Sequence, residues 1–136
     1  MRRRSLLALL AAPLALRAAS GRADTPQGPE RRVLLDAARG PAEAALRQPL
    51  RFFVTALNRE GVWAFLLATM QRPDGGRPRR AMRDDLTSDS YVALLRREGS
   101  GWRIVDFAVG PTDVAWQGWD RQHGAPASVF VIPEGR

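Results

Sequence analysis

The stretch that decides the fold is residues 50–70, LRFFVTALNREGVWAFLLATM. Two runs rich in β-branched and aromatic residues, 50–57 and 62–70, flank the polar interruption Asn58-Arg59-Glu60-Gly61. This pattern is typical of a β-hairpin with a four-residue turn. The second run carries no charge on either face, so we expect it to lie inside a sheet with cover on both sides.

A second hairpin is predicted at residues 91–109. The runs 91–97 and 102–109 flank Glu98-Gly99-Ser100-Gly101, whose glycines can supply the positive φ that a tight turn requires. Arg103 stands between two apolar residues in the second of these runs. The last strand should therefore have one solvated position.

The residues before the first hairpin have helical periodicity. Apolar side chains recur at three- to four-residue spacing from Val33, and Pro29 suits a first helical turn. Gly40-Pro41 interrupts the pattern, and Gln48-Pro49 ends it. One kinked helix and two short helices both satisfy this pattern.

A short helix is predicted after the second hairpin. Thr112 or Asp113 can cap it, Trp116 and Trp119 lie within it, and residues 124–126 close it with a Gly-Ala-Pro sequence.

Together these elements predict one α+β domain over residues 30–133. It has an N-terminal helix, kinked or split, packed on a curved four-stranded antiparallel sheet of two hairpins, and a short C-terminal helix. A chain of 136 residues with 45% apolar and 26% charged residues suits a single domain. The absence of cysteine excludes a disulfide scaffold and a thiolate metal site.

The first 23 residues have the form of a signal peptide. Arginines at 2–4 precede an apolar stretch, 6–16, and small residues allow cleavage after Ala23 or, alternatively, after Gly21. The stretch is shorter than the roughly 20 residues that a bilayer crossing needs. We expect no permanent membrane anchor and a periplasmic or secreted protein, whose polar residues 24–29 form a flexible leader.

Two features of the basic residues bear on export and partners. Arg3-Arg4-Ser5-Leu6-Leu7 also fits a twin-arginine signal, so general secretion and twin-arginine export both stay open. Without residues 1–23, 16 arginines face 14 acidic residues, so the formal charge falls from +7 to +2. No basic stripe alternates with aromatic residues, and we therefore predict no nucleic-acid partner.

Asp106 and His123 are the candidate catalytic residues. Asp106 interrupts an apolar strand, so it could serve as an acid in a pocket, or it could mark the solvated face of that strand near Arg103. His123, the only histidine, follows Asp120 by three residues, so an oriented imidazole could act as a general base. No Gly-x-Ser-x-Gly elbow, phosphate-binding glycine loop or second histidine accompanies them, which favours a binding role over catalysis. We predict no metal and no cofactor.

Two regions are candidate binding surfaces. Trp116 and Trp119, three residues apart, could stack together on a ligand, or they could anchor the C-terminal helix to the sheet. Residues 71–90 form a long segment with Arg79, Arg80 and Arg83 ahead of acidic residues. This segment could present a cationic surface or be disordered.

Several segments resemble a set of small exported bacterial proteins of uncharacterised function. They are PLRFFV at 49–54, GVWAF at 61–65, WRIV at 102–105 and GPTDVAW at 110–116, and the likeness spans residues 31–130. This resemblance implies export but no activity. A helix followed by an antiparallel meander is also similar to cystatin-like and nuclear-transport-factor-like domains, a likeness that implies architecture alone.

The sequence therefore predicts an exported accessory or binding domain of the cell envelope. Its contact surface would be Trp116, Trp119 and the 71–90 segment, and its partner an envelope protein or a small ligand. The alternative is a small pocket enzyme of the isomerase or hydrolase kind that uses Asp106 or His123. A purely structural envelope role is a third hypothesis.

Overall fold

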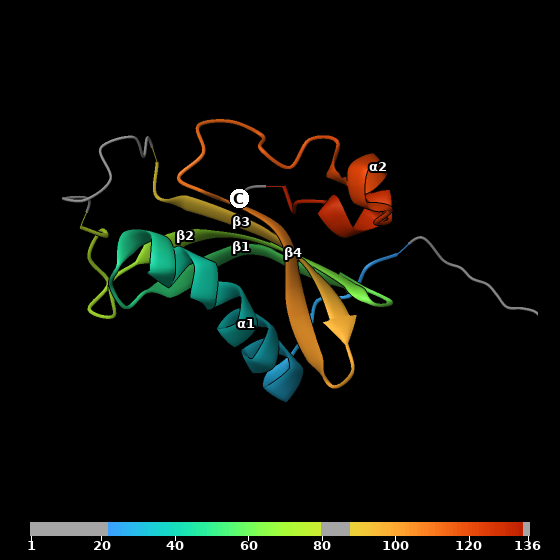
Figure 1. Cartoon of the computed structure of the whole chain (residues 1–136), viewed down its shortest axis with the longest axis horizontal. Coiled ribbons are helices and arrows are strands. Elements are labelled where there is room, and N and C mark those ends of the chain that lie inside the picture. The colour runs from blue at the N-terminus through green and yellow to red at the C-terminus, as the bar shows by residue number, and fades with distance from the viewer. Residues whose placement is uncertain (1–21, 80–87, 135–136) are drawn as a thin grey trace, which may run out of the picture.

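The protein is described by a computed structural model that covers residues 22–79 and 88–134 (Figure 1). Most of the predicted signal peptide, and the candidate binding residues Arg80 and Arg83, lie outside the described residues. The elements are α1 (Gly28–Leu46), β1 (Arg51–Glu60), β2 (Trp63–Gln71), β3 (Ser90–Glu98), β4 (Gly101–Val109), α2 (Trp119–His123) and the 3-10 helix η3 (Ala127–Phe130).

The predicted α+β class is confirmed. The four strands form one antiparallel sheet in the order β1-β2-β3-β4, made of two hairpins joined through β2 and β3. In Figure 1, α1 crosses one side of this sheet, and α2 with the C-terminal segment lies on the other side.

Both hairpin turns have two residues, so the four-residue turn predicted for the first hairpin is wrong. β1 continues through Glu60, which pairs with Trp63, and β3 continues through Glu98, which pairs with Gly101. Gly61 and Gly99 take positive φ at the first turn position. Asn58, Arg59 and Glu60 have the polar composition of a turn. They instead continue edge strand β1, because residues far away in the chain bind their side chains: Asn58 donates to the Val129 and Val131 carbonyls, and Arg59 contacts Glu30.

α1 is one continuous helix of 19 residues with Pro41 inside it, which selects the single-helix alternative. Its buried stripe is Leu34, Ala38, Ala42 and Leu46. A proline within a helix removes the N–H that would bond the carbonyl four residues earlier. Pro41 therefore lacks the donor for the Ala37 carbonyl. The hydroxyl of Tyr91 donates to the next carbonyl along the helix, that of Ala38, at 2.7 Å, so β3 holds α1 beside this gap.

The sheet has a hydrophobic core on each face, as the uncharged second run predicted. On the α1 side, Leu66 and Met70 of β2 pack with the buried stripe of the helix. On the other side, Phe65 packs with Trp119 and Val129 from the C-terminal segment. β2 is therefore covered on both faces, and the C-terminal segment supplies one of the covers.

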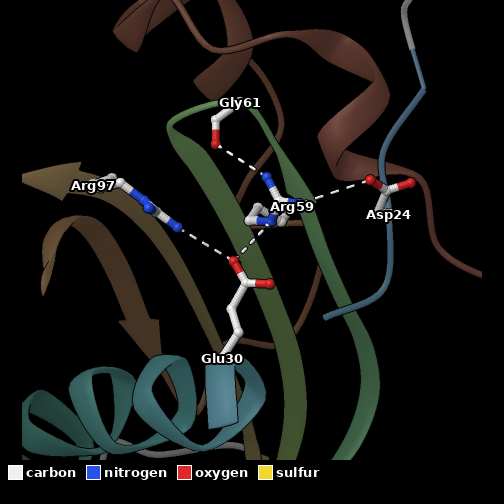
Figure 2. A network of polar contacts seen from close by, with 5 residues as sticks. All are labelled: Asp24, Glu30, Arg59, Gly61 and Arg97. Atoms are coloured by element: carbon white, nitrogen blue, oxygen red, sulfur yellow. Dashed lines mark hydrogen bonds and ion pairs between the residues drawn. The ribbon is translucent and has the colours of Figure 1, made fainter. Parts of the chain in front are cut away.

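Asp24, the first residue of the stretch 24–29 that the sequence predicts to be a flexible leader, bridges to β1. The backbone of Asp24 exchanges two hydrogen bonds with Arg59, at 2.8 and 2.7 Å. Figure 2 shows the charged network that adjoins this bridge: Arg59 contacts Asp24 and Glu30, and Glu30 also contacts Arg97. The helix begins at Gly28, slightly before the predicted boundary. The unpaired backbone of edge strand β1 explains why this stretch is bound.

The predicted C-terminal helix is shorter than expected. α2 begins after Gly118, so Trp116 precedes it and neither Thr112 nor Asp113 caps it. Gly118 adopts φ 88°, a conformation that glycine accepts without steric cost. Within the described residues, no helix combines the length and apolar character needed to cross a membrane.

Candidate functional site

The structure brings the two candidate catalytic residues together. His123 Nε2 lies 2.8 Å from Asp106 Oδ2, although 17 residues separate them in the chain. Asp106 Oδ1 accepts a second hydrogen bond, at 2.9 Å, from the backbone N–H of Phe107. The side chains of His123 and Asp106 are 19% and 30% exposed, so the pair is half-buried.

A β-bulge places Asp106 for this contact. Ile104 lies opposite Leu95 and Asp106 opposite Leu94, so Val105 is an extra residue in β4. The bulge puts Asp106 on the side of the sheet where α2 packs. His123 is the last residue of α2, and its ring meets that of Trp119 edge-on at 6.4 Å.

The pair has the hydrogen bond of a general base, but neither side chain lines any of the surface hollows described for residues 22–79 and 88–134. The hollow whose lining includes Asp120, three residues before His123, is lined by neither Asp106 nor His123. Across residues 22–79 and 88–134, no cluster of three or more His, Asp or Glu side chains is arranged to hold a metal ion. In this arrangement the pair clamps α2 onto β4.

A surface hollow of about 360 Å³ lies in the C-terminal layer. Its lining residues are Val114, Trp116, Gln117, Gly118, Asp120, Ala127 and Phe130. Phe65, fully buried in β2, supports its aromatic members: the ring of Trp116 lies 5.8 Å from it and that of Phe130 lies 5.0 Å from it. The wall of the hollow is therefore built on the core of the sheet.

The predicted contact surface is divided by the structure. Trp119 is only 6% exposed and belongs to the core, whereas Trp116 is half-buried and lines the hollow. Arg79 lines a different hollow, beside Arg72 and Pro73, and its backbone bonds the side chain of Gln48. Of the predicted binding residues in the described ranges, Trp116 alone lines the C-terminal hollow.

Charges in the described part of the 71–90 segment pair with one another. Arg77 contacts Asp89 at 2.7 Å, and the hydrogen bond between them raises the pKa of Arg77 above its ordinary value. The backbone N–H of Gly76 donates to Asp74 at 2.8 Å, and this bond holds the pKa of Asp74 below its ordinary value. Arg77 and Asp89 thus link the two described parts of the segment.

Phe130 is a lining residue that sequence reasoning did not single out. It ends η3, inside an apolar run that reads as core. Only the packing of that run against Phe65 reveals the hollow. Its one sequence signal, an aromatic residue among aliphatic ones, does not distinguish a lining residue from a buried one.

Comparison of the chain with protein-family models, with curated proteins and with solved structures gives no match. The resemblance to small exported bacterial proteins therefore stays a prediction.

Proposed function

We propose that this chain is an exported binding domain of the cell envelope, and that the hollow beside Trp116 receives a cationic group of its ligand. The observation that carries the proposal is the composition of the hollow. Trp116 and Phe130 supply aromatic rings, and Asp120 supplies the one charge among the described residues that line it.

Aromatic rings and a carboxylate together suit a positively charged ligand. A cation near a tryptophan ring is attracted by about 0.5–2 kcal/mol, depending on how far it is desolvated. The backbone N–H of Arg121 donates to Asp120 Oδ1 at 2.8 Å, which orients this carboxylate. The ligand class is therefore an amine, a quaternary ammonium compound or a basic side chain of a partner protein.

The proposal is tested by titrating the purified protein with tetramethylammonium and, as a neutral control of the same shape, tert-butanol. The chain has four tryptophans, and their indole N–H signals can be followed separately by NMR. We expect the Trp116 signal to move with the cation and not with the alcohol. Asp120→Asn should weaken the response, and Trp116→Ala should abolish binding detected at neighbouring amides.

Two results would contradict the cation-binding proposal. Equal responses to both compounds would mean that the hollow is merely apolar, and no response would mean that it binds neither. Export is tested separately, by cell fractionation and by the N-terminal mass of the recovered protein. A full-length chain found in the cytoplasm would refute export.

The contact between His123 and Asp106 favours one second candidate, a small hydrolase. It is tested with p-nitrophenyl acetate as the probe substrate and His123→Gln as the variant. An enzyme should lose turnover in this variant while its free energy of unfolding stays close to wild type. A structural clamp should lose stability, and neither protein should turn over the ester.

A further inference from the structure

The last strand of the sheet, β4, has an open edge. Among residues 22–79 and 88–134, it pairs only with β3. Gly110 N–H donates to Ser90 O at 2.8 Å, and backbone direction alternates along an antiparallel strand. The backbone groups of Phe107 and Val109 therefore point away from β3. The bond from Phe107 N–H to the Asp106 side chain agrees with this direction.

An apolar groove of about 460 Å³ runs beside this edge. It is lined by Pro41, Ala44 and Ala45 of α1 and by Phe107, Ala108 and Val109 of β4. Val33 and Ala37 continue the same flank of α1 at helical spacing, so the flank carries no charge over three turns. Val33 is 46% exposed and Phe107 is 44% exposed.

We infer that a second copy of this chain occupies the groove, with β4 of each copy paired antiparallel about a two-fold axis between Val105 and Asp106. In this register Ile104 faces Phe107 of the second copy, and Trp102 faces Val109. The two-fold axis repeats each apolar pair. The bulge at Val105 lies at the axis in both strands, so the outward-facing backbone groups of the two β4 edges keep the same spacing.

The charges of β4 favour this register. Arg103 lies opposite Arg96, and Asp106 lies opposite Leu94, so both project on the face of the C-terminal layer. The two-fold axis sets Arg103 diagonal to Asp106 of the second copy, within reach of a long side chain. Pairing centred on Arg103 would instead set two arginines opposite each other. The Phe107 N–H exchanges its bond to Asp106 for the Ile104 carbonyl of the second copy.

The direction of α1 determines what fills the groove. Near the start of α1, Glu30 contacts Arg97, whose partner in β4 is Trp102. Further along α1, Ala38 contacts Tyr91, whose partner in β4 is Val109. α1 and β4 therefore run the same way. The two-fold axis then brings Val33 of the second copy to the end of the groove that Pro41 lines. Exposed Val33 and Phe107 are both covered in this dimer.

The first test is the molecular mass of the purified protein by sedimentation over a concentration series. We expect a dimer, and we expect Val33→Asp and Phe107→Lys each to raise its Kd about tenfold or more. Val62→Asp and Phe53→Lys are matched controls, because these residues are 40% and 66% exposed away from β4. A wild-type protein that stays monomeric at millimolar concentration overturns the inference, as does a dimer that the controls weaken equally.

The second test fixes the register. The chain has no cysteine, so introduced cysteines report single contacts. Residues 103 and 108 face each other in a non-hydrogen-bonded pair, where Cα atoms lie about 4.5 Å apart and a disulfide can form. A mixture of Arg103→Cys and Ala108→Cys chains should cross-link, and neither chain should do so alone. Cross-linking of Arg103→Cys alone, or a dimer with no cross-link in the mixture, overturns the proposed pairing.

Discussion

Tyr91 offers the sharpest test of how α1 is held to the sheet. It is fully buried, its ring stacks on Phe52 at 5.3 Å, and its hydroxyl donates to the Ala38 carbonyl. Tyr91→Phe removes the hydroxyl and keeps the ring. Loss of one buried hydrogen bond should lower the free energy of unfolding by about 1 kcal/mol at pH 7.

The same substitution should have a different effect in alkali. Burial raises the pKa of Tyr91 above its ordinary value of 10.0, so the phenol ionises first in the unfolded chain. A raised pKa contributes stability below pH 10 that is lost as the pH rises. At pH 11 the wild type should have lost about 1.4 kcal/mol, while Tyr91→Phe loses nothing from this group. The two proteins should then agree within about 0.5 kcal/mol.

The composition of the chain makes this measurement unusually clean. Tyr91 is the only tyrosine, and the chain has neither lysine nor cysteine. Between pH 9 and 11 the phenol is therefore the only side chain expected to titrate, because the arginines stay protonated throughout this range. Urea unfolding at each pH gives the stabilities, and absorbance at the phenolate band follows ionisation. Ionisation of the folded protein near pH 10, or a constant difference between the two proteins, would refute the reasoning.

Three further predictions follow from packing and local contacts. Trp119→Ala should lower the free energy of unfolding by about 3–5 kcal/mol, and Trp116→Ala by less than half as much, because Trp116 is only half-buried. Equal losses in urea titrations would mean that both tryptophans belong to the core. The pKa of Asp74, measured by NMR, should lie below its ordinary value of 3.8, because the Gly76 N–H donates to the carboxylate. The contribution of this carboxylate to stability is therefore present at neutral pH and is lost as the pH falls through the lowered pKa. An unshifted pKa would show that the bond is absent in solution. Pro41→Ala restores a helical N–H and should raise the free energy of unfolding by about 1–3 kcal/mol in the same assay; a variant no more stable than the wild type would contradict this expectation.

The candidate site shows where prediction from sequence stopped. Asp106 and His123 were each recognisable as unusual residues, but nothing in the chain reported that they touch. The bulge at Val105 brings them together, and bulges leave no periodic signal in an apolar strand. The spacing of Trp116 and Trp119 suggested one shared face. Because α2 starts only at Trp119, these two residues have different environments instead.

The sequence alone determined the α+β class, the two hairpins and the covered second strand. These follow from alternating and periodic apolar residues, which depend on neighbours in the chain. Turn length, the continuity of α1 through Pro41, the fate of residues 24–29 and the hollow beside Trp116 were decided by tertiary structure. Each depends on an edge strand or on a residue far away in the chain: the backbone of Arg59 binds Asp24, the Tyr91 hydroxyl holds α1 at Ala38, and Phe65 supports the Trp116 ring.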